Sequence, residues 1–270
     1  MVNIRRGIYV LPSIFTGANL GIGFLSVIYS INEQFTAAAW AILASIIMDM
    51  VDGRIARLTN TTSRFGLEFD SLSDLISFGV APAILMYQML LSGMKGPGIA
   101  IALFYVMAGA LRLARFNVKA QDGEASTEFS GLPIPAAAGM LASLVLSYQL
   151  FLDGQEVTVK TIPLIMKKMP FFFHMLPLIV IIISMLMIST VPYQAFKKFK
   201  AGRPKSLHLI SLFLVTILFI VTYPQNSIFI IFLAYLLSGF VGYIARYWRL
   251  RKLLINSFKS KSPDETSPQK

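Results

Sequence analysis

The sequence predicts an all-α polytopic integral membrane protein with about eight transmembrane helices. Its composition lies outside the range of ordinary soluble domains, because 56% of the 270 residues are hydrophobic, only 14% are charged and the mean hydropathy is +0.68. Mostly apolar intervals of roughly 20 residues, the length that crosses a bilayer, follow one another along the chain. The eight spans are expected at residues 8–31, 35–57, 66–92, 97–117, 131–152, 170–194, 207–222 and 227–247.

These spans divide the chain into three parts. Residues 1–194 form a membrane core, and residues 195–250 contain a basic linker followed by two further C-terminal spans. The Tyr-Pro-Gln-Asn sequence at 223–226 breaks the apolar pattern between those last two spans. Residues 251–270 are basic and rich in Lys, Ser and Pro, which predicts a disordered tail.

The basic residues predict the orientation of the spans. The net charge of +11 could indicate nucleic-acid binding, but the charges alternate with the spans. If each span reverses direction, 20 of the 24 Lys and Arg residues lie on one side of the membrane. Positive charge concentrates in the cytoplasm, so both termini are expected there, and no nucleic acid is needed to explain the charge.

Four aspartates lie inside the predicted spans, where ionisable groups are costly and usually functional. Asp49 and Asp52 are three residues apart and Asp70 and Asp74 are four apart, so each pair shares one helical face. The connection at 58–65 is short, which predicts that the two helices are antiparallel neighbours. The four carboxylates would then meet at one level near the cytoplasm.

Such a cluster predicts a metal site. Four close anions cannot all stay ionised in a low dielectric unless cations join them. The chain has no cysteine, so thiolate ligands are excluded, and oxygen ligands favour Mg²⁺ or Mn²⁺. Four carboxylates can hold two such ions, an arrangement that stabilises a phosphoryl group during in-line displacement.

Small residues occupy the same helical faces as the aspartates. Gly53, Ala56 and Gly66 would let a ligand approach the backbone closely. Small residues also serve helix packing in membranes, so on their own they do not decide between a ligand site and a packing interface.

The string Asp49-x2-Asp52-Gly53-x2-Ala56-Arg57-x8-Gly66-x3-Asp70-x3-Asp74 resembles the signature of the CDP-alcohol phosphotransferase family at all eight positions. The resemblance implies a six-helix core over residues 8–194, with the last two spans as an addition. It also implies that Asp49, Asp52 and Asp70 ligate two metal ions, and that Asp74 completes the site and is the candidate general base.

The same resemblance implies a nucleotide-binding side. Gly53, Ala56 and Gly66 would leave room for the cytidine, and Arg57 would lie near the diphosphate. Ser13 stands where many relatives have Asn, so the first helix matches the pattern less well. The residues of that helix expected near the nucleotide are Pro12, Thr16 and Asn19.

The acceptor alcohol is expected to be L-serine. Residues 63–82, 110–117 and 131–137 resemble the phosphatidylserine synthase branch of the family, which implies CDP-diacylglycerol and serine as substrates and phosphatidylserine and CMP as products. Arg112, Arg115 and Asn117 are candidates for binding serine, because Arg binds a carboxylate bidentately and the serine ammonium needs acceptors.

Alternatives remain open at this point. The two arginines could instead anchor their helix to lipid phosphates. The same chemistry could act on an inositol phosphate or a glycerol phosphate, and a cation transporter would also carry acids inside the membrane. The setting implied by the resemblance is a prokaryotic-type cell membrane with a cytoplasmic active site and membrane lipids as neighbours, and a homodimer is compatible with the sequence.

Overall fold

The computed structural model describes residues 4–59, 63–121, 128–152, 171–194 and 222–260. The span expected at 207–222 lies outside these residues except for Thr222. The elements in chain order are α1 Ile4–Ile31, α2 Phe35–Thr59, α3 Arg64–Asp74, η1 Leu75–Val80, α4 Ala81–Met86, η2 Tyr87–Leu91, η3 Ser92–Met94, α5 Gly96–Gln121, β1 Glu128–Ser130, α6 Ile134–Leu152, α8 Phe171–Ile188, β2 Pro192–Gln194 and α10 Pro224–Ser260.

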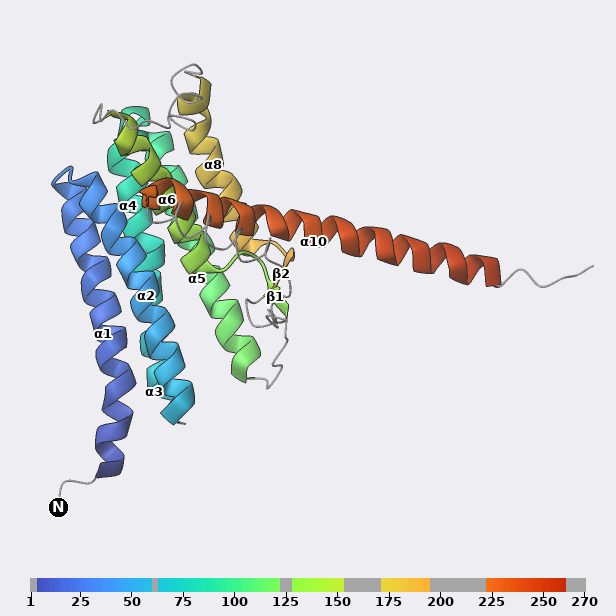
Figure 1. Cartoon of the computed structure of the whole chain (residues 1–270), viewed down its shortest axis with the longest axis horizontal. Coiled ribbons are helices and arrows are strands. Elements are labelled where there is room, and N and C mark those ends of the chain that lie inside the picture. Colours follow the sequence, from blue (N-terminus) through green and yellow to red (C-terminus); the bar gives the residue numbers. More distant parts are fainter. Residues whose placement is uncertain (1–3, 60–62, 122–127, 153–170, 195–221, 261–270) are drawn as a thin grey trace, which may run out of the picture.

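The described residues form a helical bundle that confirms the predicted membrane-protein class (Figure 1). Four helical segments are long and apolar enough to cross a membrane, at Ser13–Ile31, Phe35–Ile55, Arg64–Met94 and Gly96–Lys119. Three shorter apolar helices lie at Ile134–Gln149, Met175–Ile188 and Pro224–Gly239. The four long segments match the first four predicted spans closely.

The third span is one continuous helical rod that changes its winding. It begins at α3, where the Ser63 side chain accepts a hydrogen bond from the Gly66 backbone N–H at 2.9 Å and caps the first turn. Directly after Asp74 the rod widens into the π-helix η1. Such π-segments often accompany functional sites, and here the Tyr105 hydroxyl donates to the Phe78 carbonyl at 3.1 Å.

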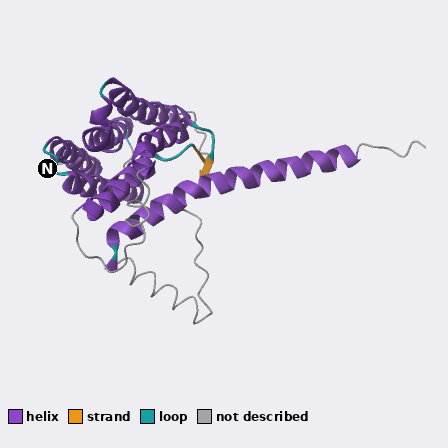
Figure 2. Cartoon of the chain, turned by 90° about the horizontal axis from the view of Figure 1, so that it is seen from above, coloured by secondary structure: helices purple, strands orange, loops and turns teal. Residues whose placement is uncertain are grey.

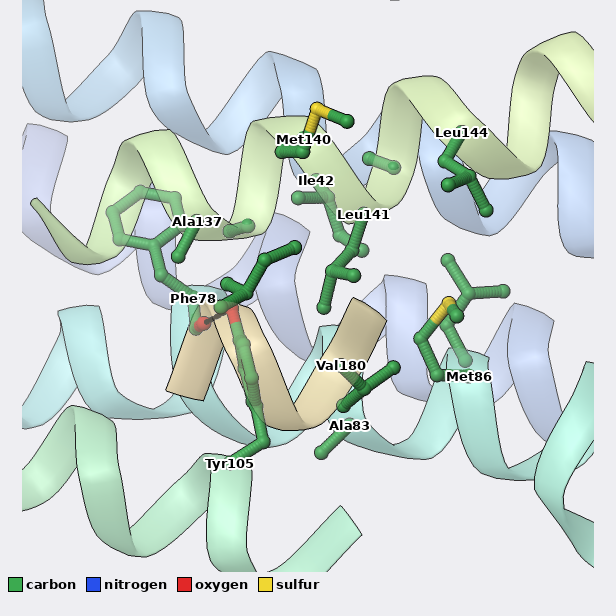
Figure 3. Close-up of a cluster of buried hydrophobic side chains, with 14 of the residues drawn as sticks. Ile42, Phe78, Ala83, Met86, Tyr105, Ala137, Met140, Leu141, Leu144 and Val180 are labelled. Carbon is green, nitrogen blue, oxygen red and sulfur yellow. Dashed lines mark hydrogen bonds between the residues drawn. The ribbon is translucent and has the colours of Figure 1, made fainter. Parts of the chain in front are cut away.

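The core lies between α2, α4, α6 and α8. Figure 3 shows Ile42, Met86, Leu141 and Val180 converging on this region, with Tyr105 directed toward Phe78 from α5. Its side chains are almost entirely apolar, so the core holds the helices in place but offers no chemistry of its own. The buried charged side chains of the described residues lie outside this core, with Asp52 on α2, Asp74 on α3 and Arg112 on α5.

The sixth predicted span ends earlier than expected. The apolar pattern predicts an end at residue 194, but α8 stops at Ile188, because Pro192 disfavours helical backbone in the residue before it. Residues 192–194 instead form β2, which pairs antiparallel with β1. Gly131 follows β1 with φ of +88° and packs against the backbone carbonyls of Met187 and Ser189, a conformation and a closeness that favour glycine.

The last helix, α10, lies across the bundle rather than along it. It packs on α6 and β2 at its N-terminal end, and its remaining length projects away from the other helices (Figure 1). Seen from above, the bundle helices appear nearly end-on while α10 runs sideways (Figure 2). The helix begins at the predicted breaker, with Pro224 in its first turn, and continues past residue 250, where we placed the start of the tail.

Candidate active site

The four aspartates meet between α2 and α3, two helices that both pack on α1. Asp49 and Asp52 lie on α2, and Asp70 and Asp74 lie on α3. Single carboxylate oxygens of Asp49, Asp70 and Asp74 all lie within 4.8 Å of one another. The convergence that helical spacing predicted is therefore present in the structure.

Asp52 adds a buried carboxylate to this group. Its side chain is only 4% exposed and lies within electrostatic range of Asp49 and Asp70. It accepts hydrogen bonds from the Thr16 side chain and the Gly53 backbone N–H. Its Oδ2 atom is buried and has no hydrogen-bond partner among the described residues. A buried carboxylate oxygen without a partner is costly, so this atom is suited to ligate a cation.

Helix α1 contributes two polar side chains to the site beside α2 and α3. The Asn19 side chain donates to Asp74 Oδ1 at 3.4 Å, and Thr16 contacts Asp52 as described above. Both residues are buried. Two of the three first-helix residues predicted on the nucleotide side, Thr16 and Asn19, therefore contact the aspartates.

Three serines that sequence reasoning missed fix α1 in this position. The hydroxyls of Ser45 and Ser77 donate to the Asn19 carbonyl at 3.4 and 3.0 Å, and the Ser73 hydroxyl donates to the Thr16 carbonyl at 3.1 Å. All three are buried. Small polar residues inside apolar spans often join helices in this way, and that signal was visible in the sequence.

The donor set fits divalent metal binding. It consists of carboxylate oxygens, with a neighbouring amide and hydroxyl, and it includes the unpartnered Asp52 Oδ2. Hard oxygen ligands suit cations such as Mg²⁺ and Mn²⁺. Mutual repulsion between the carboxylates would also be relieved by a bound cation.

The remaining residues predicted on the nucleotide side lie near the same end of α2 and α3. Gly53 follows Asp52 and is partly buried, and Gly66 sits in the first turn of α3. Pro12 lies on α1, and Ala56 and Arg57 lie on α2, but the side chains of these three residues fall outside the described part of the structure.

The three residues predicted to bind the acceptor have different surroundings. Arg112 on α5 is buried, 9% exposed, and lies within electrostatic range of Asp74. Its Nε atom is buried without a hydrogen-bond partner among the described residues. Arg115, one turn later, donates from Nη1 to the Ile188 carbonyl at 3.0 Å and so binds the last residue of α8.

Asn117 joins α5 to α3. Its Nδ2 donates to the Ser71 hydroxyl at 3.0 Å, and that hydroxyl is 3.2 Å from Asn117 Oδ1. Nδ2 also lies 3.4 Å from Glu68 Oε2. Ser71 neighbours Asp70, so Asn117 holds α5 against the helix that carries two of the aspartates.

Comparison with known proteins identifies the family to which this site belongs. Residues 9–191 match the model of the CDP-alcohol phosphatidyltransferase family. The chain is 34% identical over 256 residues to the CDP-diacylglycerol–serine O-phosphatidyltransferase of Helicobacter pylori, covering 94% of this chain and 98% of that protein.

Two further relatives match about half of the chain. The CDP-diacylglycerol–serine O-phosphatidyltransferase of Mycobacterium tuberculosis is 39% identical over 153 residues, 54% of this chain and 53% of that protein. The archaetidylserine synthase of Methanothermobacter thermautotrophicus is 40% identical over 139 residues, 51% of this chain and 58% of that protein. On the family match, the near full-length relative and the aspartate site together, the chain belongs to the CDP-alcohol phosphatidyltransferase family of integral membrane enzymes.

Proposed function

We propose that this enzyme transfers the phosphatidyl group of CDP-diacylglycerol to the hydroxyl of L-serine, giving phosphatidylserine and CMP. The three relatives support serine as the acceptor, because serine stands in each of their names although the lipid part differs between phosphatidyl and archaetidyl. Serine is therefore the shared element of relatives that differ in the lipid.

The observation that carries the acceptor assignment is the buried guanidinium of Arg112. A buried charge with an unpartnered N–H calls for an anionic ligand, and the carboxylate of serine would supply one. Asp74 lies within electrostatic range of Arg112, so a serine held at Arg112 would have its hydroxyl near the aspartates.

Arg115 and Asn117 hold α5, the helix that carries Arg112, in its position. Arg115 ties α5 to the end of α8, and Asn117 ties it to Ser71 on α3. In this proposal Arg112 contacts the serine carboxylate directly, while the other two residues fix the helix that carries it. Of the three residues predicted to bind serine, this proposal keeps Arg112 as a direct ligand, and it makes Arg115 and Asn117 positioning residues because their side chains contact the protein.

Asp74 acts as the general base in this mechanism. It takes the proton of the serine hydroxyl, the hydroxyl oxygen attacks the phosphorus that bears the diacylglycerol, and CMP leaves. Asn19 donates to Asp74 Oδ1 and orients that carboxylate. Gly53, Ala56, Gly66, Arg57 and Pro12 would line the cytidine diphosphate side.

Asp49, Asp52, Asp70 and Asp74 would hold two divalent cations, Mg²⁺ or Mn²⁺. When bound, these ions neutralise the carboxylates and stabilise the charge that develops on the diphosphate. The unpartnered Asp52 Oδ2 and the close oxygens of the other three aspartates support this ligand set.

We further propose eight spans with the site and both termini on the cytoplasmic side. The four long and three shorter apolar helices, with the apolar segment at 207–222, would make this number. For the last span this requires α10 to turn along the bundle, whereas in the structure it lies across it. The N-terminal end of α1, the α2–α3 junction and the C-terminal end of α5 lie at one end of the bundle (Figure 1). We keep residues 1–194 as the membrane core, while α10 carries the second part of the chain past residue 250 to Ser260.

An acceptor panel tests this proposal. Purified full-length protein is incubated with CDP-diacylglycerol and, separately, serine, glycerol 3-phosphate, an inositol phosphate or ethanolamine, and CMP is measured. Serine should release CMP far faster than the others. Faster release with glycerol phosphate or an inositol phosphate would reassign the acceptor but keep the family chemistry.

A further inference from the structure

We propose that Tyr105 is a positioning residue for the transfer reaction: its hydrogen bond to the third span holds the π-helix η1, and this winding sets the direction in which Asp74 points. The inference rests on the proposed role of Asp74 as general base. It adds a residue that lies outside the aspartate site, since Tyr105 is on α5 and its side chain is fully buried in the apolar core.

The sequence removes one backbone donor directly after η1. Pro82 follows Phe78 by four residues, the position from which an α-helix supplies an N–H to the Phe78 carbonyl. Proline has no N–H, and its ring crowds that carbonyl, so this bond is absent. The Tyr105 hydroxyl donates to the same carbonyl at 3.1 Å (Figure 3). A side chain of α5 thus supplies the donor that Pro82 cannot, in a buried region where an unsatisfied carbonyl is costly.

The winding of η1 determines how the two ends of the third span are turned relative to each other. A π-turn closes with one residue more than an α-turn, and the Ala81 N–H accordingly donates to the Ile76 carbonyl. Before η1 the span carries Asp74, and after it Leu85 and Met86 are buried in the core. If η1 rewound as an α-helix while the core-packed part stayed in place, Asp74 would turn away from its present direction.

On the α1 side, η1 is tied directly to the partner of the proposed base. The hydroxyl of Ser77 in η1 donates to the Asn19 carbonyl at 3.0 Å, and the Asn19 side chain donates to Asp74 Oδ1 at 3.4 Å. All three residues are buried. A change in the winding of η1 would therefore move both Asp74 and the residue that orients its carboxylate.

On the α5 side, the contact with η1 continues toward the proposed acceptor residue. Gly109 lies one turn after Tyr105, and a Cβ built on it would be 4.0 Å from the Cα of Gly79 in η1. Arg112 follows at the next turn, so Tyr105, Gly109 and Arg112 share one face of α5. The hydrogen bond from Tyr105 thus fixes the register between the helix that carries the acceptor residue and the span that carries the base.

The test is Tyr105→Phe in the full-length enzyme, which removes the hydroxyl and keeps the ring in the core. Turnover is expressed per Mn²⁺ bound at saturation, so that unfolded protein does not count. The kcat should fall at least about tenfold, since a misplacement of about 1 Å can cost about 100-fold, while the KM for CDP-diacylglycerol should not change. Tyr87→Phe is the matched control and should behave as wild type, because Tyr87 packs against the same core but its hydroxyl makes no hydrogen bond to the described residues.

A second change, Pro82→Ala, separates positioning from stability. The alanine N–H can donate to the Phe78 carbonyl in an α-helical turn, so adding this change to Tyr105→Phe should restore the melting temperature that the single variant loses. It should not restore kcat, because the turn that forms is an α-turn rather than a π-turn. Pro82→Ala alone keeps the Tyr105 hydroxyl and should retain most of the wild-type kcat.

These variants leave the proposal open to refutation. A wild-type kcat in Tyr105→Phe, recovery of kcat in the double variant, or an equal loss in Pro82→Ala alone would overturn the positioning role. If Tyr105→Phe gives no folded protein, the double variant decides, because its carbonyl has a donor. All variants are measured with the acceptor that the wild type uses fastest, so a wrong serine assignment would change the acceptor but not the comparison. Retained kcat in Asp74→Asn would instead refute Asp74 as the general base.

Discussion

The individual residues of the site are carboxylates on α2 and α3, with hydrogen-bond partners on α1 and α2. Helical spacing was enough to predict that Asp49 and Asp52 share a face and that Asp70 and Asp74 share another, because this periodicity is fixed by the backbone. Spacing could not predict which oxygen stays without a partner. That depends on Thr16 bonding Asp52 while Oδ2 remains unpaired, which only the three-dimensional arrangement shows.

Because Asp52 has an unpaired oxygen, replacing this residue tests metal binding without a measurement of turnover. In Asp52→Asn the affinity for Mn²⁺, followed by its paramagnetic resonance signal, should fall at least about 100-fold, since even loss of an outer partner costs 10–100-fold. The exposed Glu33→Gln change removes the same charge elsewhere and should leave Mn²⁺ affinity as in wild type. Equal affinities in wild type and Asp52→Asn would exclude Asp52 as a ligand.

At the element scale, the site depends on how closely α1 approaches the third span. The buried serines bond the α1 carbonyls, and Gly23 meets η1 where a side chain would collide with the backbone of Ser77. The contact therefore requires a residue without a side chain on α1. This approach brings Thr16 and Asn19 to the aspartates.

Gly23→Ala should push α1 away from η1. Overpacking of this kind costs about 1–3 kcal/mol, so the melting temperature in detergent should fall and activity should decrease as Asn19 leaves Asp74. Gly21→Ala is the matched control two residues earlier, because a Cβ there meets nothing within 4 Å. Its melting temperature should be unchanged or slightly higher, and similar losses in both variants would contradict the packing explanation.

The sequence predicted elements well where charge-free length decides them, and poorly where tertiary contacts decide them. The limits of the first four spans follow from charged or breaker residues at their ends. The end of α8 and the β1–β2 pair could not be found this way, because Ser130 and Pro192 are paired across a long stretch of chain. The direction of α10 could not be predicted from the sequence either, since apolar length does not specify whether a helix runs along the bundle or across it.

In the whole molecule, the helix ends near the aspartates lie at the same end of the bundle as many of the basic residues. The α2–α3 junction and the C-terminal end of α5 lie together at the end of α1 where the chain begins (Figure 1). The basic residues near these ends predict that this side faces the cytoplasm. A water-soluble acceptor such as serine would then reach the aspartates from the cytoplasm.

Single-cysteine labelling tests this orientation, because the chain has no cysteine of its own. In right-side-out vesicles an impermeant maleimide should label a cysteine at Ser92 and should label one at Ser126 only after the membrane is opened. Inverted vesicles should give the reverse pattern. Labelling of the cysteine at Ser126 from outside in intact right-side-out vesicles would place the active site on the external side and contradict this orientation.

In the proposed mechanism the aspartate site uses divalent metal to transfer the phosphatidyl group to serine. The most direct measurement follows CMP and labelled lipid together, in purified protein stripped of metal and supplied with CDP-diacylglycerol and labelled serine. We expect neither product until Mg²⁺ or Mn²⁺ is added, and then equal molar amounts of CMP and labelled phosphatidylserine. Labelled lipid formed at an undiminished rate after complete chelation would exclude a metal-dependent transfer, and CMP released with metal but without labelled lipid would exclude serine as the acceptor.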